Sequence, residues 1–144
     1  MTPTITLTDA PVPSARAAIL RGLVHFNESQ MNRPECHRLL AVLLSDPDTG
    51  ETIGGLWGET LLSWLHVDLL FVPETLRRAG IGRRLMGEAE TEAVRRGCIG
   101  AWLDTYSFQA RGFYEKLGYS LFGTIDDMPH GHSRFFVKKQ FSER

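Results

Sequence analysis

Residues 67–87 constrain the fold of this 144-residue chain more than any other stretch. They begin with the unbroken apolar run 69–72, Leu-Leu-Phe-Val, which is typical of a strand buried on both faces. Pro73 ends that strand because it has no N–H to donate to a sheet. The segment 77–82, Arg-Arg-Ala-Gly-Ile-Gly, then leads directly into a helical pattern. A buried strand, a tight turn and a helix in this order predict a domain that mixes helices and sheet.

The turn between this strand and this helix has the features of an anion site. Gly80 and Gly82 allow tight folding and bring main-chain N–H groups close to a ligand. The first N–H groups of a helix are unpaired and carry partial positive charge. Cations are disfavoured there by about 0.3–1 kcal/mol each, yet four arginines cluster at this point: Arg77, Arg78, Arg83 and Arg84. A bound anion explains this cluster, and arginines directed into water from a solvated loop are the alternative.

The residues after Gly82 narrow the class of anion. A P-loop places Lys and then Ser or Thr at the helix start, but Arg83 and Arg84 occupy these positions. A dinucleotide-binding turn requires a third glycine where this chain has Leu85. The remaining prediction is a pyrophosphate held without a metal by backbone amides and arginines.

Composition limits the class of protein. Hydrophobic residues make up 42% of the chain and charged residues 23%, which is ordinary for a soluble globular protein. The net charge of −1 gives no indication of a nucleic-acid or membrane partner. Cys36 and Cys98 are far apart in the sequence, and the N-terminus lacks the pattern of a secretion signal. We therefore expect one domain spanning residues 1–144, located in the cytoplasm.

Hydrophobic periodicity predicts the elements of the N-terminal half. A strand is expected at 4–8, and a helix at 15–24 with Ser14 as its N-cap. Residues 25–36 are expected to form a polar loop or a broken helix. Three strands of an antiparallel meander follow, at 38–45, 51–59 and 62–72, with the Asp-Pro-Asp-Thr-Gly turn at 46–50 and with Gly54 and Gly55 suggesting a bulge or close backbone approach.

The C-terminal half alternates helices with strands. An amphipathic helix at 81–96 carries an apolar residue every four positions and ends at Gly97. The strand 98–104 that follows should lie parallel to the strand before the helix, with a right-handed crossover. A short helix at 108–117, capped by Ser107, and two strands at 119–123 and 133–139 complete the chain.

Two motifs resemble the GNAT superfamily of N-acetyltransferases. The family signature Gln/Arg-x-x-Gly-x-Gly/Ala is matched by Arg77, Gly80 and Gly82, and the string 113–119, Phe-Tyr-Glu-Lys-Leu-Gly-Tyr, resembles its second cofactor motif. The resemblance covers roughly residues 51–139. It implies a single α/β (α+β) domain with a mixed, mostly antiparallel sheet of about six to seven strands and about four helices. A splayed parallel pair would lie in the middle of the sheet.

The resemblance also implies acetyl-CoA as cofactor and acetyl donor. The backbone of residues 78–83 would hold its pyrophosphate, and its pantetheine arm would run beside the strand, with a gap around Leu70 and Trp102. Ser107 stands where the family often has Asn, so its cofactor contact is weaker. The cofactor-binding residues expected on this basis are Leu70, Phe71, Val72, Arg77, Arg78, Ala79, Gly80, Ile81, Gly82, Arg83, Ser107 and Tyr114.

Acetyl transfer to an amine requires an acid, an oxyanion donor and a route for the amine proton. By resemblance, Tyr114 is the general acid, although it also lies on the apolar stripe of its helix, and the backbone N–H of Leu70 stabilises the oxyanion. Candidate bases are Glu59, His66 and Asp68, with water as the alternative. His66 and Asp68 share a face of their strand unless a bulge intervenes.

The acceptor is predicted only as a primary amine of a small molecule or a peptide, attacked directly in a ternary complex. Candidate acceptor contacts are Phe26, Asn27, Glu28, Trp57, Trp64, Asp126 and Asp127. No metal site is expected, because His130 and His132 in a glycine loop are a weak pattern. A non-catalytic acyl-CoA sensor is the alternative function, and a homodimer is the commonest assembly of the family.

Overall fold

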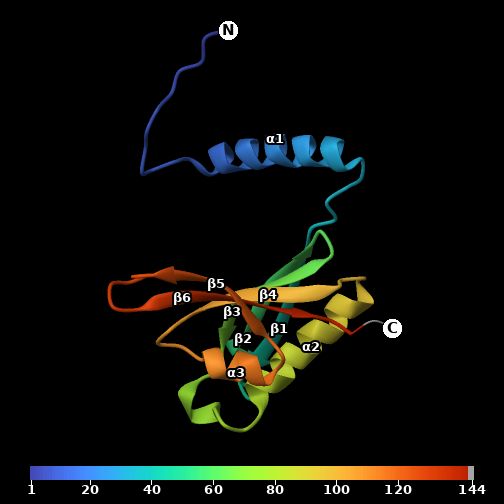
Figure 1. Cartoon of the computed structure of the whole chain (residues 1–144), viewed down its shortest axis with the longest axis vertical. Helices are drawn as coiled ribbons and strands as arrows, with labels where there is room; N and C mark the ends of the chain where they lie inside the picture. The colour runs from blue at the N-terminus through green and yellow to red at the C-terminus, as the bar shows by residue number, and fades with distance from the viewer. Residues whose placement is uncertain (143–144) are drawn as a thin grey trace. The chain divides into compact units, whose positions relative to one another are not determined.

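The computed structural model describes residues 1–142 and contains two compact units (Figure 1). The N-terminal unit is Met1–Glu35, and the main unit begins at Cys36. The main unit contains a six-stranded sheet with two α-helices and a short 3-10 helix.

The N-terminal unit consists of an extended segment and one long helix, α1 (Pro13–Met31). Pro13 occupies the first turn, where its missing N–H costs nothing, and Asn32 ends the helix in the left-handed conformation with φ 56°. The predicted strand at 4–8 is absent, and Val12, not Ser14, is the N-cap. The helix also continues through most of the region expected as a loop.

Side-chain hydrogen bonds explain the extra helical turns of α1. Asn27 Nδ2 donates to Glu35 Oε2 at 3.0 Å, and the Glu35 main-chain N–H donates to Glu28 Oε2 at 2.9 Å. The polar residues that suggested a loop therefore hold the following segment beside the end of the helix. No residue of α1 is buried, so this unit has no core of its own.

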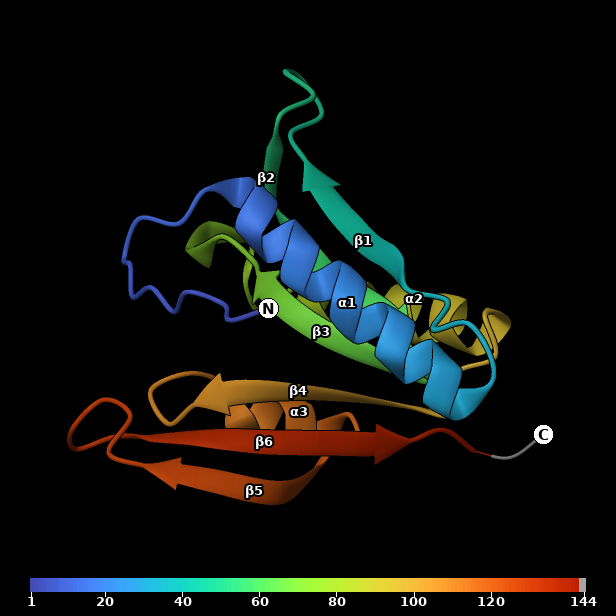
Figure 2. The ribbon, with the colours of Figure 1, turned by 90° about the horizontal axis from the view of Figure 1, so that it is seen from above.

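The sheet of the main unit has the strand order β1-β2-β3-β4-β6-β5 (Figure 2). Only the central pair, β3 and β4, is parallel, as expected for a strand–helix–strand crossover. The strands are β1 (Arg38–Ser45), β2 (Thr52–Leu61), β3 (Trp64–Phe71), β4 (Gly100–Tyr106), β5 (Ser120–Asp126) and β6 (Ser133–Gln140). The predicted fold class, meander and parallel central pair are confirmed.

Helices α2 (Ile81–Arg95) and α3 (Arg111–Lys116) lie on the same face of this sheet (Figure 1). Alternate strand residues meet them in one apolar core, where burial contributes about 1.5–3 kcal/mol for each large side chain. The most deeply buried residues are Leu56, Leu65, Met86, Ala89, Ala93, Ala101, Leu103 and Val137. The strand side chains that alternate with these core residues point to the opposite face of the sheet, which α2 and α3 do not cover.

The C-terminal end of α2 is tied to the first two strands. Arg96 Nε donates to Glu92 Oε2 at 2.7 Å, and Arg96 Nη1 donates to the Leu39 carbonyl and to Thr60 Oγ1, both at 3.1 Å. Hydrogen bonds from Arg95 and Arg96 lower the pKa of Glu92 to about 2. Glu92 and Arg96 therefore form an ion pair across one turn of the helix.

Helix α3 is shorter than predicted, beginning at Arg111 and not at 108. The residues before it bind backbone groups elsewhere: Gln109 Oε1 accepts the Tyr106 N–H at 2.7 Å, and Ser107 Oγ accepts the Ser133 N–H at 2.9 Å. The predicted role of Ser107 as a helix cap is wrong, because its hydroxyl joins the end of β4 to the start of β6 instead.

Candidate active site

The two central strands separate halfway along their length. Residues 64–67 of β3 pair with residues 100–103 of β4, and the described part of the chain has no such pairs beyond Val67 and Leu103. Leu70 thus lies beside the gap, as expected, whereas Trp102 lies in the paired half, opposite His66. The gap expected around Leu70 and Trp102 is therefore displaced toward Asp104.

A β-bulge lies where the separation begins. Trp57 pairs with Leu69 and Gly58 pairs with Val67, so Asp68 is an extra residue in β3. Gly58 makes this possible because a Cβ at that position would lie 2.4 Å from the His66 carbonyl oxygen. The bulge also disrupts the simple alternation that would have placed Asp68 on the same face as His66.

The turn after β3 presents main-chain N–H groups to solvent. It contains the 3-10 helix η1 (Glu74–Leu76) and two left-handed residues, Arg78 with φ 68° and Gly80 with φ 76°. Within residues 1–142, no acceptor is found for the N–H groups of residues 78–83. Successive free N–H groups at a helix start form a concave binding site for an anion. The geometry fits the pyrophosphate expected from the sequence.

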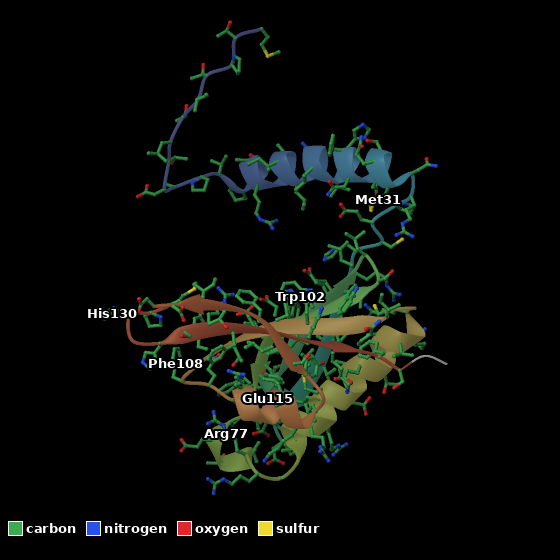
Figure 3. The ribbon with its side chains drawn as sticks, viewed as in Figure 1. Met31, Arg77, Trp102, Phe108, Glu115 and His130 are labelled. Carbon is green, nitrogen blue, oxygen red and sulfur yellow. The ribbon has the colours of Figure 1, made fainter. Side chains whose placement is uncertain are left out.

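Arg77 has a structural role in this turn (Figure 3). Its Nε donates to the Val72 carbonyl at 2.8 Å, and its guanidinium lies 5.9 Å from the centre of the Phe71 ring. Arg77 therefore joins the end of β3 to the turn. Gly82 also has a second role, because a Cβ there would lie 3.2 Å from the Phe113 ring and would separate α2 from α3.

Tyr114 lies on α3 below the sheet, with 8% of its surface exposed. Its ring packs against Phe113 and Tyr119, with centroids 5.1 and 6.1 Å away. Burial, with a smaller effect of the Asp104 carboxylate, raises the pKa of Tyr114 to about 12. Its hydroxyl is therefore protonated at neutral pH and able to donate a hydrogen bond.

The base candidates lie on the sheet face opposite the helices. Glu59 on β2 is the register partner of His66 on β3, and His66 Nδ1 lies 3.7 Å from Glu59 Oε1. Asp68 is on the bulge and exposed. The structure adds His37, which the sequence does not suggest as a base because it lies outside any periodic segment; its Nε2 is 2.7 Å from Glu59 Oε2.

The residues proposed from sequence to contact an acceptor are dispersed. Trp57 is exposed on β2, and Phe26 and Asn27 belong to the N-terminal unit. Asp126 Oδ1 accepts a hydrogen bond from Ser133 Oγ at 3.3 Å, and Asp127 occupies a left-handed turn position.

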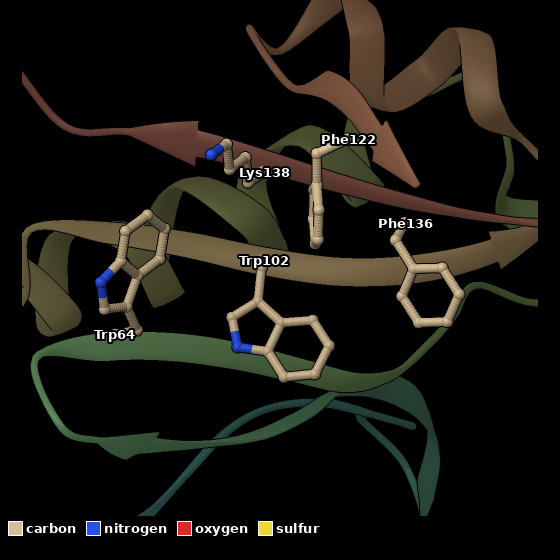
Figure 4. Close-up of a pocket in the computed structure, with 5 residues that line it drawn as sticks. All are labelled: Trp64, Trp102, Phe122, Phe136 and Lys138. Carbon is tan, nitrogen blue, oxygen red and sulfur yellow. The ribbon is translucent and has the colours of Figure 1, made fainter. Parts of the chain in front are cut away.

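Trp64 lines a shallow hollow of about 370 Å³ on the sheet face opposite α2 and α3 (Figure 4). The hollow is lined by Trp64, Trp102, Phe122, Phe136 and Lys138. Sequence alternation marks these positions as one face of neighbouring strands, but only the strand order brings β3, β4, β5 and β6 together.

No group of three metal-ligating side chains is found among residues 1–142. The same residues contain no helix with the length and apolar character to cross a membrane.

Comparison with known proteins establishes the family to which this chain belongs. The model of the acetyltransferase (GNAT) family matches residues 8–119. The chain belongs to the GNAT family. It is therefore an enzyme that uses acetyl-CoA to acetylate amines, which confirms the expected family, cofactor and enzyme class and disfavours the sensor alternative.

Two curated relatives and one solved structure are similar to this GNAT acetyltransferase over much of its length. An acetyltransferase of Agrobacterium fabrum is 37% identical over 94% of this chain and 97% of that protein. The blasticidin-S acetyltransferase of Streptomyces morookaense is 45% identical over 65% of this chain and 69% of that protein. A crystal structure from Agrobacterium tumefaciens, described as an acetyltransferase, has 36% identity and a TM-score of 0.89, covering 96% of this chain and 99% of that one.

Proposed function

We propose that this GNAT acetyltransferase acetylates a primary amine on a small molecule, with acetyl-CoA bound between the separated ends of β3 and β4. The observation that carries the proposal is the loss of β3–β4 pairing beyond Val67, beside a turn with free N–H groups. The 45% identity to a blasticidin-S acetyltransferase supports a small-molecule acceptor over a peptide.

The donor would bind in two parts. The main-chain N–H groups of residues 78–83 would hold the pyrophosphate, and Arg83 would add charge at the start of α2. The pantetheine arm would lie along residues 70–72, using main-chain groups that β4 leaves free. Ser107 is not part of this donor site in our proposal, because its hydroxyl already accepts the Ser133 N–H.

The reaction would proceed by direct attack. The neutral amine forms a C–N bond to the acetyl carbon, the main-chain N–H of Leu70 stabilises the oxyanion, and the C–S bond breaks to release the thiolate. Tyr114 would donate a hydrogen bond to that sulfur. Full proton transfer from a phenol with a pKa of about 12 to a thiolate of pKa about 8.5 is uphill by roughly 5 kcal/mol. The hydroxyl therefore stabilises the leaving group without ionising first.

Three wider features belong to the same proposal. The whole chain acts as one acetyltransferase domain, since the family model spans both units. A cytoplasmic location fits two free cysteines, Cys36 and Cys98. The enzyme forms a homodimer, because α1 by itself buries no residue and an isolated helix of this length is marginal in water.

The proposed function is tested by measuring thiol release from acetyl-CoA with a panel of nucleoside antibiotics, aminoglycosides, polyamines and peptides. We expect turnover with at least one small-molecule amine. The variant Tyr114→Phe should lower kcat by about 10–10³-fold, as expected for loss of one positioned donor, while calorimetry shows unchanged coenzyme A affinity. Turnover with peptides alone would contradict the acceptor class, and an unchanged kcat in Tyr114→Phe would contradict the role of the tyrosine.

A further inference from the structure

Three titratable side chains meet on the sheet face opposite α2 and α3. His37 precedes β1, Glu59 lies on β2 and His66 lies on β3. The Glu59 carboxylate bridges the two rings: Oε2 lies 2.7 Å from His37 Nε2, and Oε1 lies 3.7 Å from His66 Nδ1. The first contact is a hydrogen bond, and the second is within ion-pair distance but longer than a hydrogen bond.

The exposed fraction of these side chains increases from His66 through Glu59 to His37. The exposed fractions are 22% for His66, 37% for Glu59 and 48% for His37. The His66 ring is also held in plane by Trp102, with ring centroids 4.0 Å apart and an interplanar angle of 16°. The arrangement therefore runs from a half-buried, fixed imidazole, through a carboxylate, to an imidazole in contact with water.

His66 is placed next to the reaction site. It is two residues before the bulge at Asp68, and its partner Trp102 is two residues before Asp104, where β3 and β4 are no longer paired. The open end of the gap, where the acetyl group would lie, is thus adjacent to the imidazole on the same strand.

We propose that His66 is the catalytic base, that Glu59 orients and stabilises it, and that His37 returns the proton to water. This inference rests on the proposed function. An acceptor amine arrives as an ammonium ion and has two protons to lose. His66 Nε2 accepts the first, which leaves the neutral amine to form the C–N bond. The second leaves the nitrogen after the C–S bond breaks and neutralises the thiolate. The balance is one acetamide, one thiol and one proton released through His66.

The carboxylate is the reason for choosing His66 over the other candidates. Glu59 Oε1 lies 3.7 Å from Nδ1, so its negative charge favours the tautomer with the proton on Nδ1 and a free Nε2, and it offsets the charge of the imidazolium. The other charged groups near His66 in the sheet register are Asp68 on its own strand, Asp104 on β4 and Lys138 on β6. Asp104 is paired with Arg134 at 2.7 Å, and Asp68 has no partner within residues 1–142 to orient it.

The test compares His66→Gln, Glu59→Gln, His37→Gln and the control Asp68→Asn on the same acceptor. We expect His66→Gln to lower kcat/KM at pH 7 by about 10²–10⁴-fold, Glu59→Gln to have a smaller effect, and His37→Gln the smallest. Coenzyme A affinity by calorimetry should be unchanged in all four. In the wild type, kcat/KM should fall as the pH is lowered, and this fall should be absent in His66→Gln. Added imidazole should restore part of the activity of His66→Gln.

A second acceptor separates base catalysis from a structural role. An alkoxyamine analogue of the acceptor is neutral at pH 7, because the oxygen beside its nitrogen lowers the basicity of the amine, so His66→Gln should acetylate it at nearly the wild-type rate. An equal loss with both acceptors, or a larger loss in Asp68→Asn, would overturn the relay. Since Glu59 and His37 are more exposed than His66, their variants report on the relay even where His66→Gln folds poorly. Wild-type inactivity on every amine would overturn the proposed function as well, whereas an active wild type with an active His66→Gln would overturn the relay alone.

Discussion

The two tyrosines of the string 113–119 have different roles. The Tyr119 hydroxyl donates to Glu90 Oε2 at 2.8 Å, and Lys139 Nζ donates to Glu90 Oε1 at 2.7 Å. Among the described residues, the Tyr114 hydroxyl has no such partner. A buried phenol normally satisfies its O–H group. Tyr119 is therefore a structural residue, and Tyr114 has a donor available for a ligand.

The raised pKa of Tyr114 predicts a loss of stability at alkaline pH. Burial and Asp104 keep the phenol protonated in the folded state up to a pKa of about 12, whereas it ionises near 10 when unfolded. The unfolded state therefore binds fewer protons between these values, and stability falls as pH rises. We expect the free energy of unfolding to fall about 1.4 kcal/mol per pH unit more steeply in wild type than in Tyr114→Phe between pH 10 and 12. Urea denaturation measures this difference, and parallel curves would contradict it.

Strand and helix positions in the main unit were predictable where one local signal dominated. The apolar run before Pro73, the four-residue apolar repeat of α2 and the turn at 46–50 each specify an element, and all three elements are present. The prediction that the apolar run is buried on both faces is wrong, because Leu69 and Phe71 are exposed on the face opposite α2. Errors arose where a side chain could bond to more than one backbone group. Ser107 closes a strand end when a helix cap was expected, and Asn27 extends a helix when a loop was expected.

The candidate site was predictable in its donor half only. Most of the proposed cofactor residues follow one another along the chain, so motif spacing alone predicts them. The relay combines His37, Glu59 and His66 with Trp102, and these residues come from four separate segments. These side chains come together only in the observed strand register, which includes the extra residue Asp68. A shift of one residue in the pairing would move each strand side chain to the other face of the sheet.

The bulge in β3 provides a test at the scale of an element. Gly58→Ala would place a Cβ 2.4 Å from the His66 carbonyl, so the backbone must move. We expect a loss of roughly 1–3 kcal/mol in unfolding free energy and a lower kcat. The matched control is Gly87→Ala in α2, where no atom lies within 4 Å of the new Cβ; it should stabilise by about 0.5–1 kcal/mol. A fully stable, fully active Gly58→Ala enzyme would show that the bulge is not required.

At the scale of the whole molecule, the N-terminal unit predicts self-association. Leu20, Leu23 and Phe26 are exposed on α1, which has no core of its own. We expect sedimentation equilibrium to give about twice the chain mass of 16.2 kDa. The double variant Leu20→Glu with Leu23→Glu should reduce the mass to that of one chain, whereas Arg16→Glu on the same helix should not. A wild-type mass of 16.2 kDa at every concentration would contradict the homodimer.

The proposed chemistry depends on where the donor binds, because the acetyl group must be held at the β3–β4 gap. Hydrogen–deuterium exchange with and without saturating coenzyme A tests it most directly, since the amides of residues 78–83 have no acceptor in the described chain. We expect strong protection of residues 78–83 and of residues 68–72, with little change in β1 or in the β5–β6 hairpin. Protection confined to other segments, or none at saturation, would contradict this location of the donor.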